Sequence, residues 1–252
     1  MNFEKYSYYY DLLYKDKNYE AEADYVKAKL LQKKQRIKTV LEFGSGTGRH
    51  ARLLAQRGFE MCGVERSKTM IEKARSETDR LGLQSIQFKQ GDIRSVRIGK
   101  KFDAVIALFH VLSYQTSNGD AQAMFETAAT HIETGGIFLF DCWYGPAVLT
   151  DRPETRVKRA EDDTVEIIRI AESVMFPNQN KVEVHYKLLA IEKSSSILQQ
   201  IDEVHPMRYF FLPEIKLMLE TSGFKLVATE NWLDSGELGF STWNATFIAE
   251  KQ

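Results

Sequence analysis

A glycine-rich loop is the segment whose residue types and spacing point most clearly to chemistry. The run Gly44–Gly48 reads GSGTG, places glycine at every second position and follows the strand-like run Thr39–Phe43. Glycine lets a backbone turn sharply and approach a ligand where a Cβ would clash, and the helix that should follow presents unpaired N–H groups. The pattern is typical of a loop that binds a nucleotide cofactor. The alternative is an ordinary tight turn between a strand and a helix.

Two further residues narrow the cofactor class. A dinucleotide fingerprint, G-x-G-x-x-G, needs glycine or alanine where Arg49 stands, and its pyrophosphate lies on the helix N-terminus. Glu65 ends the strand-like run Glu60–Val64 about twenty residues after Gly44, where a carboxylate can accept hydrogen bonds from both hydroxyls of a ribose. We therefore expect an adenosine-containing cofactor without a pyrophosphate. The alternative for Glu65 is a solvent-exposed strand end.

Composition and charge limit the class of protein. The chain has 252 residues, 43% of them hydrophobic, which suits one α/β domain with an additional segment. Its 34 basic and 35 acidic side chains leave a net charge of −1, which argues against nucleic acid or an anionic membrane as a partner. Cys62 and Cys142 fall in two expected buried strand regions, which indicates reduced thiols and a cytoplasmic protein. Without a metal-ligand spacing or a long apolar run, we expect no metal site, no secretion and no membrane span.

The glycine loop lies in a regular alternation of short buried strands and helices. Such alternation predicts a parallel sheet with right-handed crossovers, whose ligands bind at the carboxyl ends of the strands. The expected strands are Thr39–Phe43, Glu60–Val64, Ser85–Lys89, Phe102–Phe109, Gly136–Phe140, Lys225–Asn231 and Thr242–Glu250. The expected helices are Asp24–Gln35, His50–Arg57, Thr69–Leu81, Asp120–Ile132 and Pro213–Gly223.

After Pro153 the pattern changes to long runs with the period-two alternation of strands. The expected strands here are Thr164–Phe176, Lys181–Glu192 and Leu198–Phe211, with a turn at residues 177–180. We interpret residues 152–211 as an antiparallel, β-rich lid or substrate subdomain, inserted into an α/β cofactor domain of residues 1–151 and 212–252. The inserted segment is expected to form one wall of the substrate pocket.

Two longer patterns resemble known families. Read with the strand before it, the loop from Glu42 to Gly48 is E-x-G-x-G-x-G, which resembles motif I of the class I S-adenosylmethionine (SAM) methyltransferases. The run Tyr10–Tyr14 (YDLLY), followed by DKNY at 16–19 and by Glu22, resembles the signature of the sugar N,N-dimethyltransferases that finish dimethylamino deoxysugars such as desosamine and mycaminose. The similarity covers nearly the whole chain and runs through Gly44–Gly48, Glu65, Asp92, 131–136, Trp143, 182–186, 202–205 and the last helix.

The resemblance implies a fold and a cofactor. The fold is Rossmann-like α/β, with a mostly parallel sheet of seven strands, an antiparallel last strand and the inserted antiparallel β lid. The cofactor is SAM, with Asp92 accepting the exocyclic amine of adenine and Ile93 covering the ring face. The residues expected to bind SAM are Tyr14, Glu42, Gly44, Ser45, Gly46, Gly48, Glu65, Arg66, Met70, Asp92, Ile93, Leu108 and Phe109.

The same resemblance places Tyr14 and His131 beside the acceptor, which makes them the expected catalytic residues. His110, Trp143 and Tyr144 follow the fourth and fifth strands, and we expect them to bind the acceptor. The alternative for Tyr14, His110, Trp143 and Tyr144 is a packing role, and the alternative for His131 is a position in a last helical turn that the helix macrodipole favours, with no catalytic role. The family's basic residue before the last strand is not matched in residues 235–239, which argues against a nucleotide diphosphate acceptor.

We therefore interpret the chain as a SAM-dependent methyltransferase that acts on an amine or hydroxyl of a small molecule, with a sugar or nucleotide sugar as the expected acceptor. A neutral amine needs positioning more than acid–base help, whereas a hydroxyl needs a base, for which His131 and His110 are the first candidates. The alternatives are an NAD-dependent oxidoreductase, which Arg49 opposes, and a non-catalytic SAM-binding protein. We expect no nucleic-acid or membrane partner and leave a homodimer open.

Overall fold

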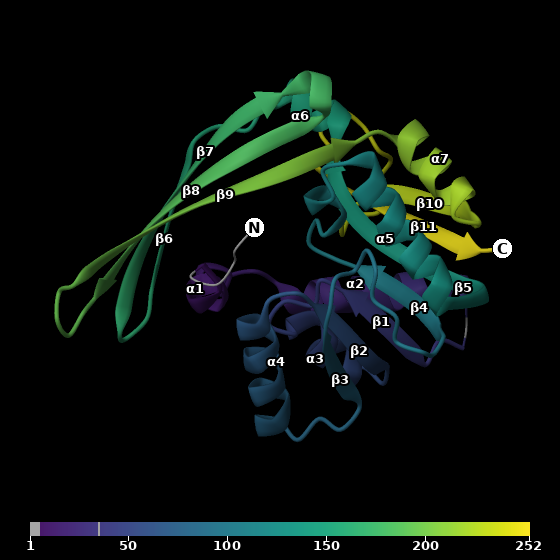
Figure 1. Cartoon of the computed structure of the whole chain (residues 1–252), viewed down its shortest axis with the longest axis horizontal. Helices are drawn as coiled ribbons and strands as arrows, with labels where there is room; N and C mark the ends of the chain where they lie inside the picture. Colours follow the sequence, from purple (N-terminus) through teal and green to yellow (C-terminus); the bar gives the residue numbers. More distant parts are fainter. Residues whose placement is uncertain (1–5, 35) are drawn as a thin grey trace.

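A mostly parallel sheet forms the centre of the fold. The computed structural model describes residues 6–34 and 36–252. The strands of this part of the sheet are β1 (Thr39–Phe43), β2 (Glu60–Glu65), β3 (Ile86–Gln90), β4 (Phe102–Ala107), β5 (Ile132–Tyr144), β10 (Phe224–Asn231) and β11 (Asn244–Lys251). They lie in the order β3-β2-β1-β4-β5 with parallel pairing, and β5 continues through antiparallel β11 to β10 (Figure 1). The expected α/β sheet, parallel except for its last strand, is confirmed.

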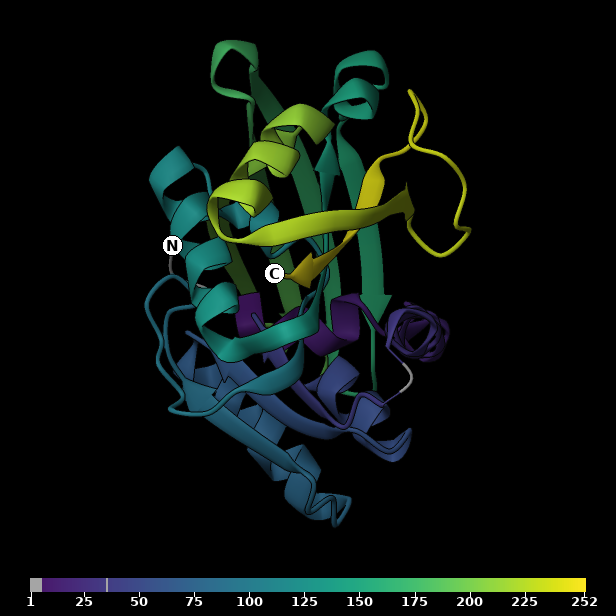
Figure 2. The ribbon, with the colours of Figure 1, turned by 90° about the vertical axis from the view of Figure 1, so that its right-hand side faces the viewer.

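Helices cover both faces of this sheet, because its strands present apolar side chains alternately to each face. The helices are α2 (Tyr19–Lys33), α3 (Arg49–Gln56), α4 (Lys68–Arg80), α5 (Asn118–His131) and α7 (Leu212–Thr221). The first three bury apolar residues against the face that presents Ile137 and Leu139 of β5. The other two pack on the face that presents Phe138 and Phe140, and Figure 2 shows them beside β10 and β11. The carboxyl ends of the parallel strands therefore open at an edge between two helical layers.

Aromatic packing fixes the position of β5. The ring of Phe125 from α5 lies edge-on to Phe138 and Phe140, with centroids 5.7 and 5.2 Å away, and Phe140 stacks on Phe247 of β11 at 5.4 Å. All four rings are completely buried. Removing one such ring costs about 3–5 kcal/mol, since the cavity left behind cannot fully close. The end of β5, which reaches the functional site, is thus held by a rigid core.

An antiparallel layer arches away from the parallel strands (Figure 1). Its strands are β6 (Arg156–Glu161), β7 (Val165–Phe176), β8 (Lys181–Glu192) and β9 (Leu198–Phe210), in the order β9-β8-β7-β6. The layer joins the main sheet where Trp143 and Tyr144 of β5 pair with Tyr209 and Phe210 of β9. On its inner face it packs around Leu13 at the end of α1 (Tyr6–Leu13). This arrangement places α1 between the arched strands and the α/β layers.

Several elements differ from the sequence-based expectation. The strand β6 was not expected, because its apolar residues Val157 and Ala160 lie three apart and so point to opposite faces. Neither α1 nor α6 (Gly145–Thr150) was expected, and α1 has no clear apolar stripe, with Tyr8 67% exposed and Leu13 fully buried. The expected strand over 102–109 ends at Ala107. Part of the expected helix Asp24–Gln35 lies outside the described residues, since Gln35 is not among them.

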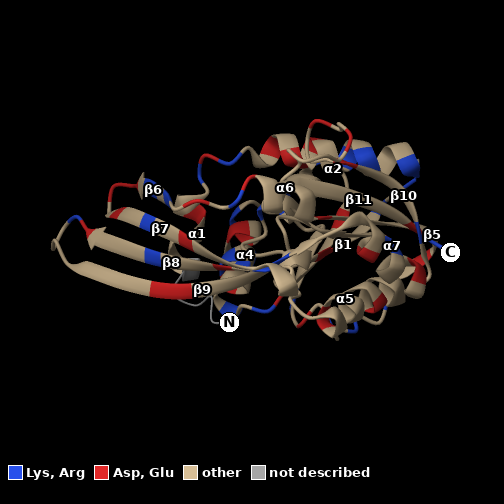
Figure 3. Cartoon of the chain, turned by 90° about the horizontal axis from the view of Figure 1, so that it is seen from above, with Lys and Arg blue, Asp and Glu red and all other residues tan. Residues whose placement is uncertain are grey.

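Charged residues of both signs are distributed over the described part of the chain. Figure 3 shows Lys and Arg interspersed with Asp and Glu over both the arched strands and the helices. Within the described ranges, no helix is long and apolar enough to cross a membrane. Cys62 and Cys142 are both buried free cysteines, and burial raises the pKa of each thiol.

Candidate functional site

A cavity of about 510 Å³ lies at the carboxyl ends of the parallel strands. The loops that follow β1, β2, β3 and β4 form one side, and the end of β5 contributes Trp143. Tyr10 and Tyr14 close it from α1 and the turn after it, and the inner faces of β8 and β9 cover the remainder. This is the edge at which open parallel sheets bind ligands. The cavity is large enough for a nucleoside-sized cofactor together with a small acceptor.

The glycine loop shapes the floor of this cavity. Gly44, Gly46 and Gly48 all have positive φ angles, 65°, 53° and 76°, a backbone conformation that costs glycine little. A Cβ on Gly44 would lie 2.5 Å from the Val111 side chain, so only glycine allows the loop after β4 to approach. A Cβ on Gly46 would meet only the Met70 sulfur, at 4.0 Å, so the backbone here faces open space. Gly44, Ser45, Gly46 and Met70 line the cavity as expected.

Gly48 and Glu42 position the loop from outside the cavity wall. A Cβ on Gly48 would lie 2.7 Å from the Phe88 ring, so this glycine permits packing against β3 and does not itself line the cavity. Glu42 is 2% exposed on β1, and its Oε2 has no hydrogen-bond partner among the described residues. Burial raises the pKa of Glu42 to about 8, and the nearby Glu65 charge acts in the same direction. The carboxyl group is therefore largely protonated at neutral pH.

Glu65 presents a prearranged carboxylate at the end of β2. Its Oε2 accepts a hydrogen bond from the Gly46 N–H at 3.1 Å, and its Oε1 accepts from the N–H groups of Arg66 and Ser67, both at 2.8 Å. Three of the roughly four acceptor positions of a carboxylate are thus used by the backbone. Glu65 and Arg66 both line the cavity. The carboxylate is fixed in direction and keeps one acceptor position on Oε2 for a hydroxyl.

Asp92 and Ile93 line the same end of the cavity from the loop after β3. Both oxygens of Asp92 accept hydrogen bonds from the Arg94 guanidinium, and Oδ1 also accepts from the Arg94 N–H at 3.0 Å. Arg94 in turn donates to Asp120 of α5. The side-chain hydrogen bond from Arg94 lowers the pKa of Asp92, so this group is an anionic acceptor.

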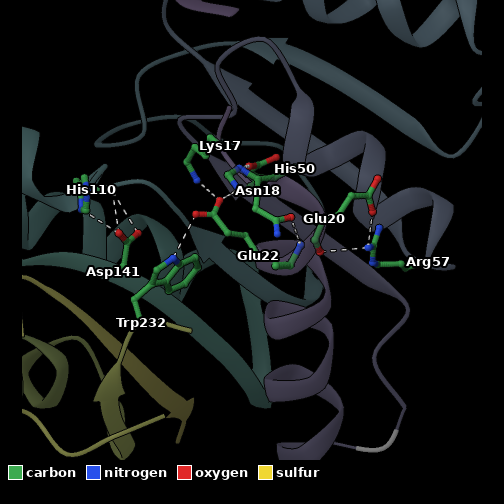
Figure 4. A network of polar contacts seen from close by, with 11 residues as sticks. Lys17, Asn18, Glu20, Glu22, His50, Arg57, His110, Asp141 and Trp232 are labelled. Atoms are coloured by element: carbon green, nitrogen blue, oxygen red, sulfur yellow. Dashed lines mark hydrogen bonds and ion pairs between the residues drawn. The ribbon is translucent and has the colours of Figure 1, made fainter. Parts of the chain in front are cut away.

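The loop after β4 carries two residues in an uncommon conformation. Phe109 and His110 have φ angles of 64° and 66°, a region that non-glycine residues occupy at a cost of about 1–3 kcal/mol each. The His110 N–H donates to both oxygens of the fully buried Asp141, and its Nδ1 lies 3.0 Å from Asp141 Oδ2 (Figure 4). Leu108, Phe109 and His110 line the cavity. A buried carboxylate thus holds this strained turn through the His110 backbone and lies close to its ring.

Tyr14 closes the cavity above Phe109. The two rings meet edge to face with centroids 5.2 Å apart, and the Tyr14 hydroxyl accepts a hydrogen bond from Arg169 of β7 at 3.2 Å. Trp143 lies on the same side, with its ring centroid 6.1 Å from that of His110. Tyr14, His110 and Trp143 therefore lie together in one cavity.

Two residues expected at the acceptor lie elsewhere, and both predictions are wrong in position. His131 ends α5 at the amino end of β5, where Nδ1 pairs with the Thr127 carbonyl at 2.7 Å and Nε2 accepts the Ile98 N–H at 3.0 Å. Burial lowers the pKa of His131, so it is a neutral histidine that joins a loop to a helix. Tyr144 follows Trp143 on β5, and successive side chains of a strand point to opposite faces. It is consequently packed in the hydrophobic core.

Three residues that were given no role complete the far end of the cavity. They are Tyr114 from the 3-10 turn η1 (Leu112–Tyr114), Tyr186 of β8 and His205 of β9. The Tyr114 hydroxyl and His205 Nδ1 are 3.2 Å apart, and the Tyr186 ring meets the His205 ring edge to face at 4.8 Å. The alternation of β8 and β9 is a signal that could have revealed Tyr186 and His205, because it places a polar or aromatic side chain among apolar neighbours on the inner face; Tyr114, on η1, has no such signal.

A network of polar contacts around Glu22 holds His50 at the edge of the cavity (Figure 4). Glu22 of α2 accepts hydrogen bonds from Lys17, from His50 of α3 at 2.7 Å and from the Trp232 indole at 3.3 Å. Burial alone would raise the pKa of Glu22, but the hydrogen bonds and charges of His50 and Lys17 outweigh it and lower the pKa to about 2. His50, which the network orients, lines the cavity. Among the described residues there is no group of three or more His, Cys, Asp or Glu side chains that could hold a metal ion.

Comparisons with known proteins find a family model and relatives that this chain resembles. Residues 40–136 match the family model described as a methyltransferase domain. A dTDP-3-amino-3,4,6-trideoxy-alpha-D-glucopyranose N,N-dimethyltransferase from Streptomyces venezuelae is 27% identical over 233 residues, which cover 91% of this chain and 92% of that protein.

Two solved structures share the fold. A SAM-dependent methyltransferase from Clostridium acetobutylicum matches with a TM-score of 0.82 and 18% identity, over 99% of this chain and 98% of the other. A SAM-bound amino pentose methyltransferase from Micromonospora echinaspora matches with a TM-score of 0.77 and 20% identity, over 100% and 98% of the two chains. The matched family spans the glycine loop, Glu65 and Asp92, whereas the structural likeness extends to the arched strands.

Proposed function

Because the chain is a SAM-dependent methyltransferase with a class I fold, we propose that it methylates the amino group of a deoxyaminosugar. One observation carries the proposal: the cavity runs without interruption from the glycine loop to an aromatic end beneath β8 and β9. A cofactor and a small acceptor would therefore share one enclosure. The relative from Streptomyces venezuelae, which is similar over nearly the full length of both chains, supports an amino sugar over the oxidoreductase alternative.

The chain's own residues fit the cofactor. Gly46 leaves open space over the loop, the Glu65 carboxylate keeps a free acceptor position for a ribose hydroxyl, and Asp92 is an anion that can accept from the adenine amine. Ile93 lies beside Asp92, where an apolar side chain can cover a ring face. When bound, SAM supplies an electrophilic methyl group on a positively charged sulfur.

The aromatic end suits an amine acceptor. Ring faces within about 6 Å stabilise a cation by about 0.5–2 kcal/mol, and both the methyl donor and a methylated amine are cations. Tyr14, Phe109 and Trp143 provide such rings around His110. Since a neutral amine is already a nucleophile, alignment of the acceptor against the methyl group supplies most of the rate enhancement. We propose Tyr14 as the residue that aligns it.

The arched strands complete the proposal. We propose residues 152–211 as a lid whose inner face selects the acceptor, with residues 1–151 and 212–252 as the SAM-binding domain. Tyr186 and His205 belong to this segment and line the cavity. A homodimer, a cytoplasmic location and the absence of a nucleic-acid partner stay predictions.

The test combines calorimetry with product analysis. We expect SAM to bind with micromolar affinity and NAD to give no heat, and we expect the purified chain to add one and then two methyl groups to dTDP-3-amino-3,4,6-trideoxy-α-D-glucopyranose in mass spectra. The free amino sugar serves as a second acceptor, since residues 235–239 contain no basic residue. SAM binding without turnover of either acceptor would refute the amino-sugar assignment and favour the non-catalytic alternative. NAD binding without SAM heat would refute the cofactor.

A further inference from the structure

Three side chains at the acceptor end form a connected line of hydrogen bonds. We propose that Tyr114, His205 and Glu203 are a proton relay that removes the proton from the methylated amine, so that the same nitrogen can accept a second methyl group. The inference rests on the proposed N-methylation and assigns catalytic roles to Tyr114 and His205. Glu203 acts through His205 and is a positioning residue.

The geometry of the relay crosses from the α/β layers to the arched strands. The Tyr114 hydroxyl, at the end of η1, lies 3.2 Å from His205 Nδ1, and His205 Nε2 lies 3.0 Å from Glu203 Oε2. Glu203 and His205 are two residues apart on β9, so both point to its inner face. His205 is 2% exposed, and the Tyr186 ring holds it edge to face at 4.8 Å. The imidazole is therefore held by a contact at each of its two ring nitrogens.

The direction of the hydrogen bonds follows from the Glu203 carboxylate. A carboxylate only accepts hydrogen bonds, so His205 carries its hydrogen on Nε2 and donates it to Glu203 Oε2. His205 Nδ1 is then the acceptor and the Tyr114 hydroxyl the donor of the second bond, and burial, which raises the pKa of Tyr114 well above its usual value, keeps that phenol protonated. In this arrangement Tyr114 lines the cavity while its hydroxyl hydrogen points to a basic nitrogen.

Charged and polar groups from several elements face the relay. Among the described residues they include Tyr186 of β8, Arg169 of β7 and Glu65 of β2, besides Tyr14 after α1. Arg169 is a cation, and its guanidinium lies over the Tyr186 ring, 5.2 Å from the centroid. Glu203 contacts His205 directly and is the nearest counter-charge for an imidazolium.

The chemistry explains why dimethylation needs such a group. Attack by the amine forms an N–C bond, breaks the C–S bond and leaves a methylammonium that has no lone pair for another attack. In the relay, the ammonium passes one proton to the Tyr114 oxygen, and the Tyr114 hydrogen passes to His205 Nδ1. The product is a neutral methylamine inside the cavity, and the proton rests on an imidazolium paired with Glu203. Charge and atoms balance without a co-reactant.

The kinetic test separates the two methyl transfers. The variants are Tyr114→Phe, His205→Asn and Glu203→Gln, with His185→Asn as the control, because His185 is a β8 histidine with a side chain 45% exposed. General base catalysis contributes about 10²–10⁴-fold, so we expect His205→Asn to slow the second transfer about 100-fold at pH 6.5 and to accumulate the monomethyl product of the dTDP-amino sugar. The first transfer should fall less, since its amine can lose a proton to water before entering. The defect should shrink at pH 9, and the control should match the wild type.

A structural role would give a different result, namely an equal loss of both transfers that does not depend on pH. That result, or an unchanged second transfer, would overturn the relay, provided that thermal unfolding and SAM affinity show each variant to be folded. A second measurement does not need the acceptor: ¹⁵N NMR of histidine-labelled protein with S-adenosylhomocysteine should show His205 protonated at Nε2. Protonation at Nδ1 would overturn the relay even if the amino sugar proved to be the wrong acceptor. Absence of wild-type turnover alone would overturn only the proposed function.

Discussion

Replacing Glu65 by alanine tests the cofactor end of the cavity most directly. The backbone N–H groups of Gly46, Arg66 and Ser67 occupy three of about four acceptor positions on its carboxylate, so one position is left for a ribose hydroxyl. One hydrogen bond to a charged group contributes about 1.5–3 kcal/mol. Since each 1.4 kcal/mol is tenfold in affinity, Glu65→Ala should raise the SAM dissociation constant by roughly 10- to 150-fold.

Calorimetric titration with SAM and with S-adenosylhomocysteine measures this change. Both ligands should lose affinity equally, because they share the ribose and differ at sulfur. Glu72→Ala is the matched control, since Glu72 lies on α4 with a side chain 61% exposed and should leave the dissociation constant unchanged. Because alanine also leaves three N–H groups of the loop without their acceptor, Glu65→Gln is measured beside it and should show a smaller loss. Dissociation constants within threefold of the wild type in both Glu65 variants would refute the ribose assignment.

Three other predictions concern stability and the roles of loops. The pKa of Glu22 is lowered to about 2, so its contribution to folding stability is present above the ordinary pKa of 4.5 and is lost as pH falls through the folded pKa. Urea unfolding should therefore show an acid-dependent loss of up to about 3 kcal/mol in unfolding free energy, and Glu22→Gln should remove this loss. An identical dependence of stability on acid pH in that variant would contradict this prediction. Gly44→Ala adds strain at a positive φ and a 2.5 Å contact, so it should lower the unfolding free energy by about 1–3 kcal/mol and abolish measurable SAM binding. Gly58→Ala is the control: its φ is also positive, but no atom lies within 4 Å of the new Cβ, so it should lower Tm and leave SAM affinity unchanged. His131→Ala removes hydrogen bonds to a helix and a loop, so it should reduce the unfolding free energy by about 1–3 kcal/mol without changing the pH profile of turnover. Loss of the basic limb of that pH profile would instead indicate that His131 acts at the acceptor.

The local sequence pattern was sufficient to predict those parts of the protein whose structure depends on residues close together in the chain. The glycine spacing of Gly44–Gly48 and the strand before it identify the cofactor loop, because sharp turns and close approach restrict the residue type itself. The alternation of short apolar strands with helices identifies the parallel sheet, since burial on both faces leaves a continuous apolar run. The carboxyl-end location of Glu65, Asp92 and His110 follows from that topology.

The acceptor end depended on tertiary structure, because its residues come from segments that the sequence does not relate. His131 stands where a family resemblance suggests an acceptor contact, yet it lies at the amino end of β5 and bonds to Ile98 and Thr127. Tyr144 differs from Trp143 by one position on β5, and the pleat alone sends one side chain to the cavity and the other to the core.

Tyr114 and His205 are the opposite case, because the fold brings into the site two residues that the sequence did not predict there. They are 91 residues apart in the chain. Their types and spacing give no sign that they meet. They are brought together because β9 pairs with the end of β5, which swings the inner face of the arched strands over η1. The sequence by itself determined the cofactor loop and the sheet around it, since local sterics and burial periodicity act over a few residues. Only the long-range pairing of strands decided which side chains meet the acceptor.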